Sequence, residues 1–275
     1  MDPFEFRYMN ICREGDKNIN SYVYPQYPME KIMDTMRPIY EKAVADAKAA
    51  DTPEKRRGVG IAWGGFNVTE GGGDSAEVAL ELMPGNKIRK YDTWHAMGQG
   101  ATTGSLVVTL EALKEMHLTP EDIQLIQNDT KTCPDTGMAG ASRSLYMDGN
   151  ATIIAANKLL AAMRKEDGTL RTYDEMKAEG IETKYLGRYE TNTTPGLCRL
   201  DPNTGIGDPT PAFTYCLNLA EVEVDTKTGK TTVLKFTCVD FVGRIGNIDA
   251  VNGQAYSGIM HGIGFALKED YADVK

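Results

Sequence analysis

Residues 97–104 read Met97-Gly98-Gln99-Gly100-Ala101-Thr102-Thr103-Gly104, a glycine-bounded turn that runs directly into a helix-patterned stretch. Apolar residues follow it at helical spacing, namely Leu106, Val107, Leu110 and Leu113. The sequence therefore predicts a helix that begins at this turn. Glycine lets the backbone approach a ligand closely, and the first turn of a helix presents free N–H groups and the positive end of its dipole. The pattern is typical of a site for phosphate or another oxygen-rich ligand.

A second glycine-bounded turn lies further along the chain and reads Gly137-Met138-Ala139-Gly140-Ala141-Ser142-Arg143-Ser144. It leads into a long helical stretch whose apolar stripe includes Ile153, Ala156, Leu160 and Met163. Two such helix starts in one chain, both with polar side chains, favour a ligand site more strongly than one does. The pattern alone leaves the alternative, two ordinary tight turns that feed helices, about equally open.

The remaining elements follow from periodicity and turn residues. We expect a helix over about 28–50, a short buried strand over 58–65, a hairpin of 76–82 and 87–93, a strand over 123–127, a hairpin of 213–224 and 231–242, and a helix from about residue 247. Residues 165–210 are polar and rich in turns and are interpreted as a surface excursion. This order indicates an α+β or mixed α/β fold. We expect residues 1–57 to form a peripheral segment with one helix and residues 58–275 to form the main domain.

Composition excludes several classes of protein. The 275 residues are 41% hydrophobic and 25% charged, which is ordinary for a globular protein. The net charge of -9 argues against nucleic acid or an anionic membrane as a general partner. No apolar run approaches a membrane-spanning length, and the first residues lack a signal-peptide pattern, so we expect a cytoplasmic location. The five cysteines form no C-x-x-C pair, so the sequence shows no iron–sulfur or zinc motif.

Common nucleotide and hydrolase motifs are missing as well. The chain holds no Rossmann fingerprint, no P-loop and no G-x-S-x-G elbow. Ser142 and Ser144 are interpreted as phosphate contacts or helix caps rather than nucleophiles, because no histidine is placed to act as their base. Arg143 could clamp a diphosphate, and the alternative is a solvated side chain on the first helical turn.

Several motifs together resemble those of the molybdenum hydroxylases, the xanthine dehydrogenases and aldehyde oxidoreductases. They are Trp94-His95-Ala96-Met97-Gly98-Gln99-Gly100-Ala101, the 139–144 turn with Gly149-Asn150-Ala151, and Asn252-Gly253-Gln254-Ala255-Tyr256-Ser257-Gly258 with the following His261 to Leu267. The opening Asp2-Pro3-Phe4-Glu5-Phe6-Arg7 and Lys227-Thr228-Gly229 resemble them too, closest to the bacterial FAD-independent aldehyde oxidoreductases. The resemblance covers nearly the whole chain and implies the fold of a molybdopterin-binding domain of this type, incomplete at its C-terminus.

The resemblance implies a set of cofactor contacts. In the family the first turn contacts the molybdopterin near the metal and the second holds the pterin and its diphosphate, while a third set lies at a helix start. The implied residues are Met97, Gly98, Gln99 and Gly100, then Ala139, Gly140, Ala141, Ser142, Arg143 and Ser144, and finally Gln254 with Asn247 and Ala250 as weaker candidates. Relatives carry histidine just before Gly-Gln-Gly, where this chain has Met97, and no residue is implied as a direct metal ligand.

By the same resemblance the reaction is hydroxylation of an aldehyde or heteroaromatic carbon with oxygen from water. The implied cofactor is molybdopterin with molybdenum, in its cytosine dinucleotide form, and electrons leave through [2Fe-2S] clusters on other segments or subunits. The family's base is a glutamate in a Gly-x-Gly-Glu segment, which this chain lacks, so no catalytic residue is assigned. The implied partners are the remaining hydroxylase polypeptide and a small-molecule substrate, and a homodimer is left open.

Two other interpretations stay open at this point. The chain could be a catalytically inert cofactor-binding or assembly module, which the missing glutamate segment favours and the intact turns count against. It could also be a truncated product that folds poorly because apolar faces lack partners. The substrate cannot be assigned from these residues.

Overall fold

The computed structural model describes residues 1–24, 26–69, 73–191 and 200–270. The chain divides into two compact units, one made of Met1–Phe66 with Ala212–Lys275 and the other of Asn67–Pro211. We call them the outer unit and the inserted unit, because the second interrupts the first in sequence. The sequence-based division at residue 57 stays a prediction.

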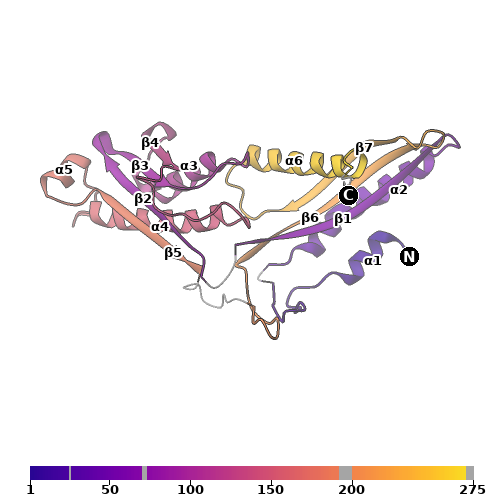
Figure 1. Ribbon diagram of the computed structural model, residues 1–275, viewed down its shortest axis with the longest axis horizontal. Helices are drawn as coiled ribbons and strands as arrows, with labels where there is room; N and C mark the ends of the chain where they lie inside the picture. The colour runs from indigo at the N-terminus through magenta and orange to yellow at the C-terminus, as the bar shows by residue number, and fades with distance from the viewer. Residues whose placement is uncertain (25, 70–72, 192–199, 271–275) are drawn as a thin grey trace, which may run out of the picture. The chain divides into compact units, whose positions relative to one another are not determined.

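The described residues of the outer unit form a three-stranded sheet and three helices. Its strands lie in the order β1-β6-β7, and β6 and β7 form an antiparallel hairpin. The elements are α1 (Pro3–Asn10), α2 (Met29–Ala50), β1 (Lys55–Val68), β6 (Ala212–Asp225), β7 (Thr231–Phe241) and α6 (Ile248–Leu267). The core forms where the apolar stripe of α2, including Met29, Met33 and Met36, packs with Leu217 and Leu219 of β6. Figure 1 shows α2 running alongside the long strands.

The inserted unit has a four-stranded sheet in the order β4-β3-β2-β5. Its elements are β2 (Ser75–Met83), η1 (Pro84–Asn86), β3 (Lys87–Asp92), α3 (Ala101–Ala112), η2 (Lys114–Met116), η3 (Pro120–Asp122), β4 (Ile123–Gln127), α4 (Ser144–Met163), α5 (Tyr173–Ala178) and β5 (Lys184–Glu190). β2 pairs antiparallel with β3 and β5, whereas β3 pairs parallel with β4. α4 packs on β2 and β5 and against α3, and apolar residues of both helices share one core cluster with β2 and β3, so both helices cover one face of the sheet.

Alternation along β2 and β3 explains that layer. Leu80, Leu82 and Ile88 are fully buried and pack with the apolar residues of α4, as strands with one covered face require. Gly187 of β5 is needed at the closest approach of helix and sheet, because a Cβ there would lie 2.0 Å from the carbonyl oxygen of Ala151. The inserted unit is thus a helix layer held tightly on one face of a mixed sheet.

The mixed helix-and-sheet fold expected from the sequence is confirmed, and so are the 76–82/87–93 and 213–224/231–242 hairpins, the 123–127 strand and the helices after both glycine-bounded turns. Two expectations were wrong. β1 is a long strand whose residues are mostly exposed or half-buried, with only Ile61 buried, rather than a short buried one. Residues 165–210 hold α5 and β5, because an edge strand with one solvent face has a polar sequence.

No helix in the described part of the chain has the length and apolar character to cross a membrane.

Candidate functional site

The two glycine-bounded turns lie at one edge of the inserted unit's sheet. β3 and β4 are parallel, with Asp92 paired to Gln127 at their carboxyl ends. The first turn follows β3 and leads to α3, and the second follows β4 and leads to α4. Carboxyl ends of parallel strands are where open sheets bind ligands. Thr93 and Thr136 tie the two loops together, since each backbone N–H donates to the other's hydroxyl at 2.9 and 2.8 Å.

The first turn takes its shape from two glycines and one amide side chain. Gly98 and Gly100 have backbone φ angles of 101° and 83°, values that residues other than glycine rarely adopt. Gln99 closes the turn, because its Oε1 accepts from the Met97 N–H at 2.5 Å and its Nε2 donates to the His95 carbonyl at 2.8 Å. Open space lies where a Gly98 side chain would begin, and Met97 is 71% exposed.

The second turn is held in a strained backbone conformation. Ala141 and Ser142 have φ of 46° and 51°, which costs about 1 kcal/mol or more for each residue with a side chain. The Thr69 N–H donates to the Ala141 carbonyl at 2.8 Å, and the Arg143 N–H donates to that of Gly140 at 3.0 Å. Such strain persists only where the surroundings fix it, and it is concentrated at functional sites.

The side chain of Arg143 holds the backbone of the second turn in this conformation from inside the turn. Its side chain is buried, and all five of its N–H groups donate within the protein. Two donate to the Asp74 carboxylate at 2.6 and 2.8 Å, and the others donate to the carbonyls of Thr136, Met138 and Ser75. The guanidinium is therefore part of the frame of the second turn.

The charge of Asp74 follows from this contact. Burial acts to raise the pKa of the Asp74 carboxyl, but the hydrogen bonds from Arg143 and Thr69 outweigh it, so the pKa lies below its ordinary value. Asp74 is thus ionised at neutral pH and forms a bidentate ion pair with Arg143.

The helix starts beyond the two turns have no side-chain caps. α3 begins after Gly100, which has no side chain to act as a cap. α4 begins after Arg143, whose side chain accepts no N–H of the helix. By contrast, Asn247 caps α6 through its Oδ1, which accepts from the Ala250 N–H at 3.0 Å. Uncapped helix starts approached by glycine-rich turns suit an anionic, oxygen-rich ligand, and so do the hydroxyls of Ser142 and Ser144.

The structure therefore brings ten of the thirteen implied contact residues to one edge of the inserted unit, those at 97–100 and 139–144. The other three lie in the outer unit, Asn247 directly before α6 and Ala250 and Gln254 within it. Asn247 and Ala250 bond to each other, and Gln254 is exposed.

A buried charged cluster behind the turns was not identified from the sequence. Lys90, Asp92 and Asp148 are all fully buried. Lys90 Nζ lies 2.6 Å from Asp148 Oδ1 and 3.3 Å from Asp92 Oδ2. Asp92 also accepts from the Ser105 hydroxyl at 2.6 Å and from the Gln127 amide at 2.8 Å. We call Lys90, Asp92 and Asp148 the buried triad.

The triad holds one cation and two carboxyl groups. Burial raises the pKa of Asp148 to about 6, with the attraction of Lys90 lowering it and the nearby Asp92 raising it. Asp148 Oδ2 has no hydrogen-bond partner among the described residues. A signal for the triad was available, because strand alternation puts Lys90 and Asp92 on the same face as the apolar Ile88.

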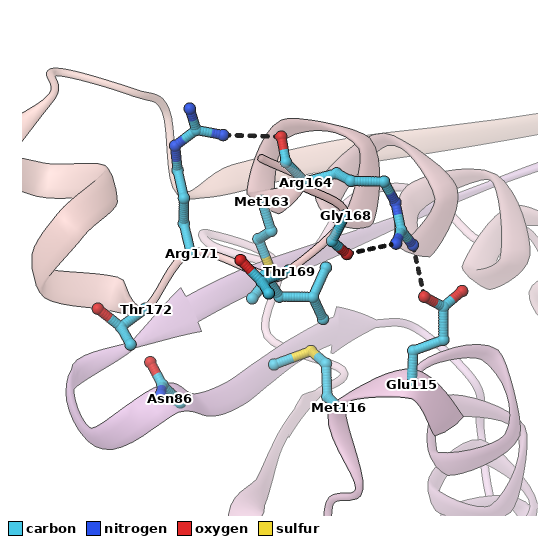
Figure 2. Close-up of a pocket in the computed structure, with 10 residues that line it drawn as sticks. Asn86, Glu115, Met116, Met163, Arg164, Gly168, Thr169, Arg171 and Thr172 are labelled. Atoms are coloured by element: carbon cyan, nitrogen blue, oxygen red, sulfur yellow. Dashed lines mark hydrogen bonds and ion pairs between the residues drawn. The ribbon is translucent and has the colours of Figure 1, made fainter. Parts of the chain in front are cut away.

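A concavity at the far end of α4 is a different place. Figure 2 shows it lined by Arg164 and Arg171, with Met163 at the end of the helix. Arg164 pairs with Glu115 and donates to the Gly168 carbonyl, and Arg171 pairs with Glu179. These cations are already neutralised by carboxylates, and the helix end there carries the negative end of the dipole. The concavity is therefore a poor site for an anionic ligand.

The described residues contain no group of three or more His, Cys, Asp or Glu side chains arranged to hold a metal ion. The two uncapped helix starts suit an anionic, oxygen-rich ligand instead.

Known proteins match this chain over most of its length. A family model for the molybdopterin cofactor-binding domain matches residues 35–273. The chain is 38% identical over its whole length to the aldehyde oxidoreductase of Megalodesulfovibrio gigas and covers 30% of that protein. The crystal structure of the aldehyde oxidoreductase from Desulfovibrio desulfuricans superimposes with a TM-score of 0.93 at 40% identity, over 99% of this chain and 30% of that one. Xanthine dehydrogenase of Dictyostelium discoideum is 22% identical over 98% of this chain and 20% of that protein.

The chain thus spans less than a third of the length of these relatives.

Proposed function

The chain belongs to the family of molybdopterin cofactor-binding domains, and from that premise we propose that its two glycine-bounded turns hold the pterin and the diphosphate of that cofactor. The observation that carries the proposal is the meeting of two uncapped helix starts at the carboxyl ends of β3 and β4. Their N–H groups and dipoles attract the diphosphate oxygens. The turn at Gly98 and Gly100 lets the pterin approach the backbone.

The residues divide into two roles in this proposal. Gly98, Gly100 and Ser144 face the ligand, whereas Gln99 and Arg143 shape the turns through their bonds to the backbone. Met97, Ala139, Gly140, Ala141 and Ser142 complete the two contact segments. The set at the start of α6, Asn247, Ala250 and Gln254, stays a prediction as a further cofactor contact.

We propose that the complete protein is a cytoplasmic oxidoreductase of the aldehyde oxidoreductase and xanthine dehydrogenase type. When bound, the molybdenum cofactor supplies hydroxylation of an aldehyde or heteroaromatic carbon with oxygen from water. The cofactor form is molybdopterin cytosine dinucleotide, and [2Fe-2S] clusters on the remaining polypeptide receive the electrons. The 275 residues of this chain contribute the residues that hold the cofactor, and the partner polypeptide contributes the base.

Replacing Gln99 tests the proposal. Gln99→Leu removes both bonds that close the first turn, so we expect the molybdenum and pterin content of the assembled protein to fall about tenfold. Metal is measured by mass spectrometry and pterin by the fluorescence of its oxidised form. The matched control is Gln124→Leu on β4, where Arg89 is the one side-chain partner of the amide among the described residues, and the content is expected to stay at the wild-type level.

Equal contents in wild type and Gln99→Leu would overturn the assignment of the first turn. An assembled protein that holds full cofactor and oxidises no aldehyde or heteroaromatic substrate would instead identify the chain as an inert cofactor-binding module.

A further inference from the structure

The buried triad connects the two helices that start at the cofactor turns. Lys90 of β3 reaches Asp148 on α4, and Asp92 at the end of β3 accepts from Ser105 on α3. Ser105 is the fifth residue of α3 and Asp148 the fifth of α4. Each of these two contacts therefore lies about one helical turn after the start of its helix. The ion pair of Lys90 with Asp92 joins the two contacts.

A charged cluster at this position has a cost that apolar side chains would avoid. Buried ion pairs are often no more stabilising than well-packed apolar residues of similar volume. What they provide is direction, because charge-assisted hydrogen bonds restrict both the distance and the angle between their partners. The apolar contacts of α4 with β2 and β5 already hold the helix on the sheet. The directional bonds of the triad therefore serve to fix the position of α4 along the sheet.

We propose that Lys90, Asp92 and Asp148 are positioning residues that hold the start of α3 and the start of α4 at the separation that the molybdopterin cofactor requires. The inference rests on the proposed function of the two turns. The triad is fully buried behind the turns and acts through the helix starts. Arg143 fixes the shape of the second turn, and the triad fixes its place relative to the first.

Trp94 provides a readout that needs no cofactor. It lies on the segment that leads into the first turn, is 6% exposed, and packs on α3 so closely that a Cβ at Gly104 would lie 2.9 Å from its ring. The other tryptophan, Trp63, is on β1 of the outer unit. In a Trp63→Phe background, acrylamide quenching of Trp94 therefore reports whether the first turn stays packed on α3.

The first variant cuts the tie to α3. Ser105→Ala removes the hydroxyl that binds Asp92, with little change in volume. The matched control is Thr109→Val, one turn later on the same buried face, where the hydroxyl donates to the carbonyl of Ser105 in its own helix and to no other group that the structure describes. We expect the Stern–Volmer constant of Trp94 to rise about twofold or more in Ser105→Ala and to stay at the wild-type level in Thr109→Val. Equal constants in the two variants would overturn the proposal.

The second variant cuts the tie to α4. Lys90→Met/Asp148→Leu removes one cation and one carboxylate, so the cluster keeps its net charge and Asp92 keeps its bonds to Ser105 and Gln127. We expect a folded protein whose pterin content in the assembled state falls at least about tenfold. A folded variant with wild-type pterin content overturns the proposal. If the variant does not fold, the comparison of Ser105→Ala with Thr109→Val decides alone.

These outcomes separate the inference from the proposed function. A wild-type assembled protein without pterin contradicts the proposed function, while the quenching comparison still tests the link between the triad and the first turn. Loss of pterin in Gln99→Leu together with full pterin in a folded Lys90→Met/Asp148→Leu variant contradicts the inference and leaves the proposed function standing.

Discussion

Single residues show where this chain departs from what its motifs alone indicate. Arg143 lies in the turn assigned to the diphosphate, yet all five N–H groups of its side chain donate to the Asp74 carboxylate and to three backbone carbonyls. A motif places a residue in a turn, but only the surrounding backbone decides whether its side chain faces the ligand or the frame. The same holds for Gln99, whose amide closes the turn in which it lies.

At this scale Asp148 predicts a pH dependence of stability. Its pKa is about 6 in the folded protein against 3.8 for the ordinary carboxyl. Between these values the folded state binds more protons than the unfolded state, so the contribution of Asp148 to the free energy of unfolding falls as pH rises from about 4 to about 6 and is level above that. At about 1.4 kcal/mol per pKa unit, the decline is about 3 kcal/mol.

Asp148→Asn is expected to lose this decline, because an amide does not titrate while its Oδ1 still accepts from Lys90. Chemical denaturation at a series of pH values measures it, with the difference between wild type and variant plotted against pH. The charged groups that bear on Asp148 are Lys90 and Asp92, so the difference reports the triad. A difference that stays constant from pH 4 to pH 7 would show that Asp148 does not titrate in this range.

At the scale of elements, strongly periodic segments were predictable and segments with conflicting signals were not. The helix expected from about residue 247 is α6, where Val251, Ala255, Ile259 and Ile263 recur at helical spacing and form its half-buried side. β5 was missed because Lys184, Arg188 and Glu190 give an edge strand the composition of a loop. The signal for α5 was present, since Thr172 and Glu175 form a capping box.

The buried triad was missed because charged residues on a core face contradict the rule that apolar residues fill it.

The contact between α4 and β5 predicts a large effect of one methyl group. In Gly187→Ala the new Cβ would lie 2.0 Å from the Ala151 carbonyl oxygen and 2.6 Å from the Ala155 nitrogen, so helix and strand must separate. We expect a loss of about 3 kcal/mol in the free energy of unfolding, measured by urea denaturation. The matched control is Gly60→Ala on β1, where a Cβ meets nothing within 4 Å and the change is expected to be small. Similar stabilities of the two variants would contradict the close approach.

At the scale of the whole molecule, the inserted unit has the features of a domain that folds by itself. Its core clusters draw every member from residues 67–211, and its two ends meet where the Thr210 hydroxyl donates to the Val68 carbonyl at 2.7 Å. A continuous segment with its own core and adjacent ends is typical of an inserted domain.

We therefore expect a fragment of residues 67–211 to unfold cooperatively in urea and to show the near-ultraviolet circular dichroism of packed aromatic residues. The control is the same fragment with Lys90→Met, which leaves two buried carboxyl groups without their cation and is expected to lose about 3 to 5 kcal/mol. A wild-type fragment with no cooperative transition would show that the inserted unit depends on the outer unit for its fold, and the cofactor edge would then be a property of the entire chain.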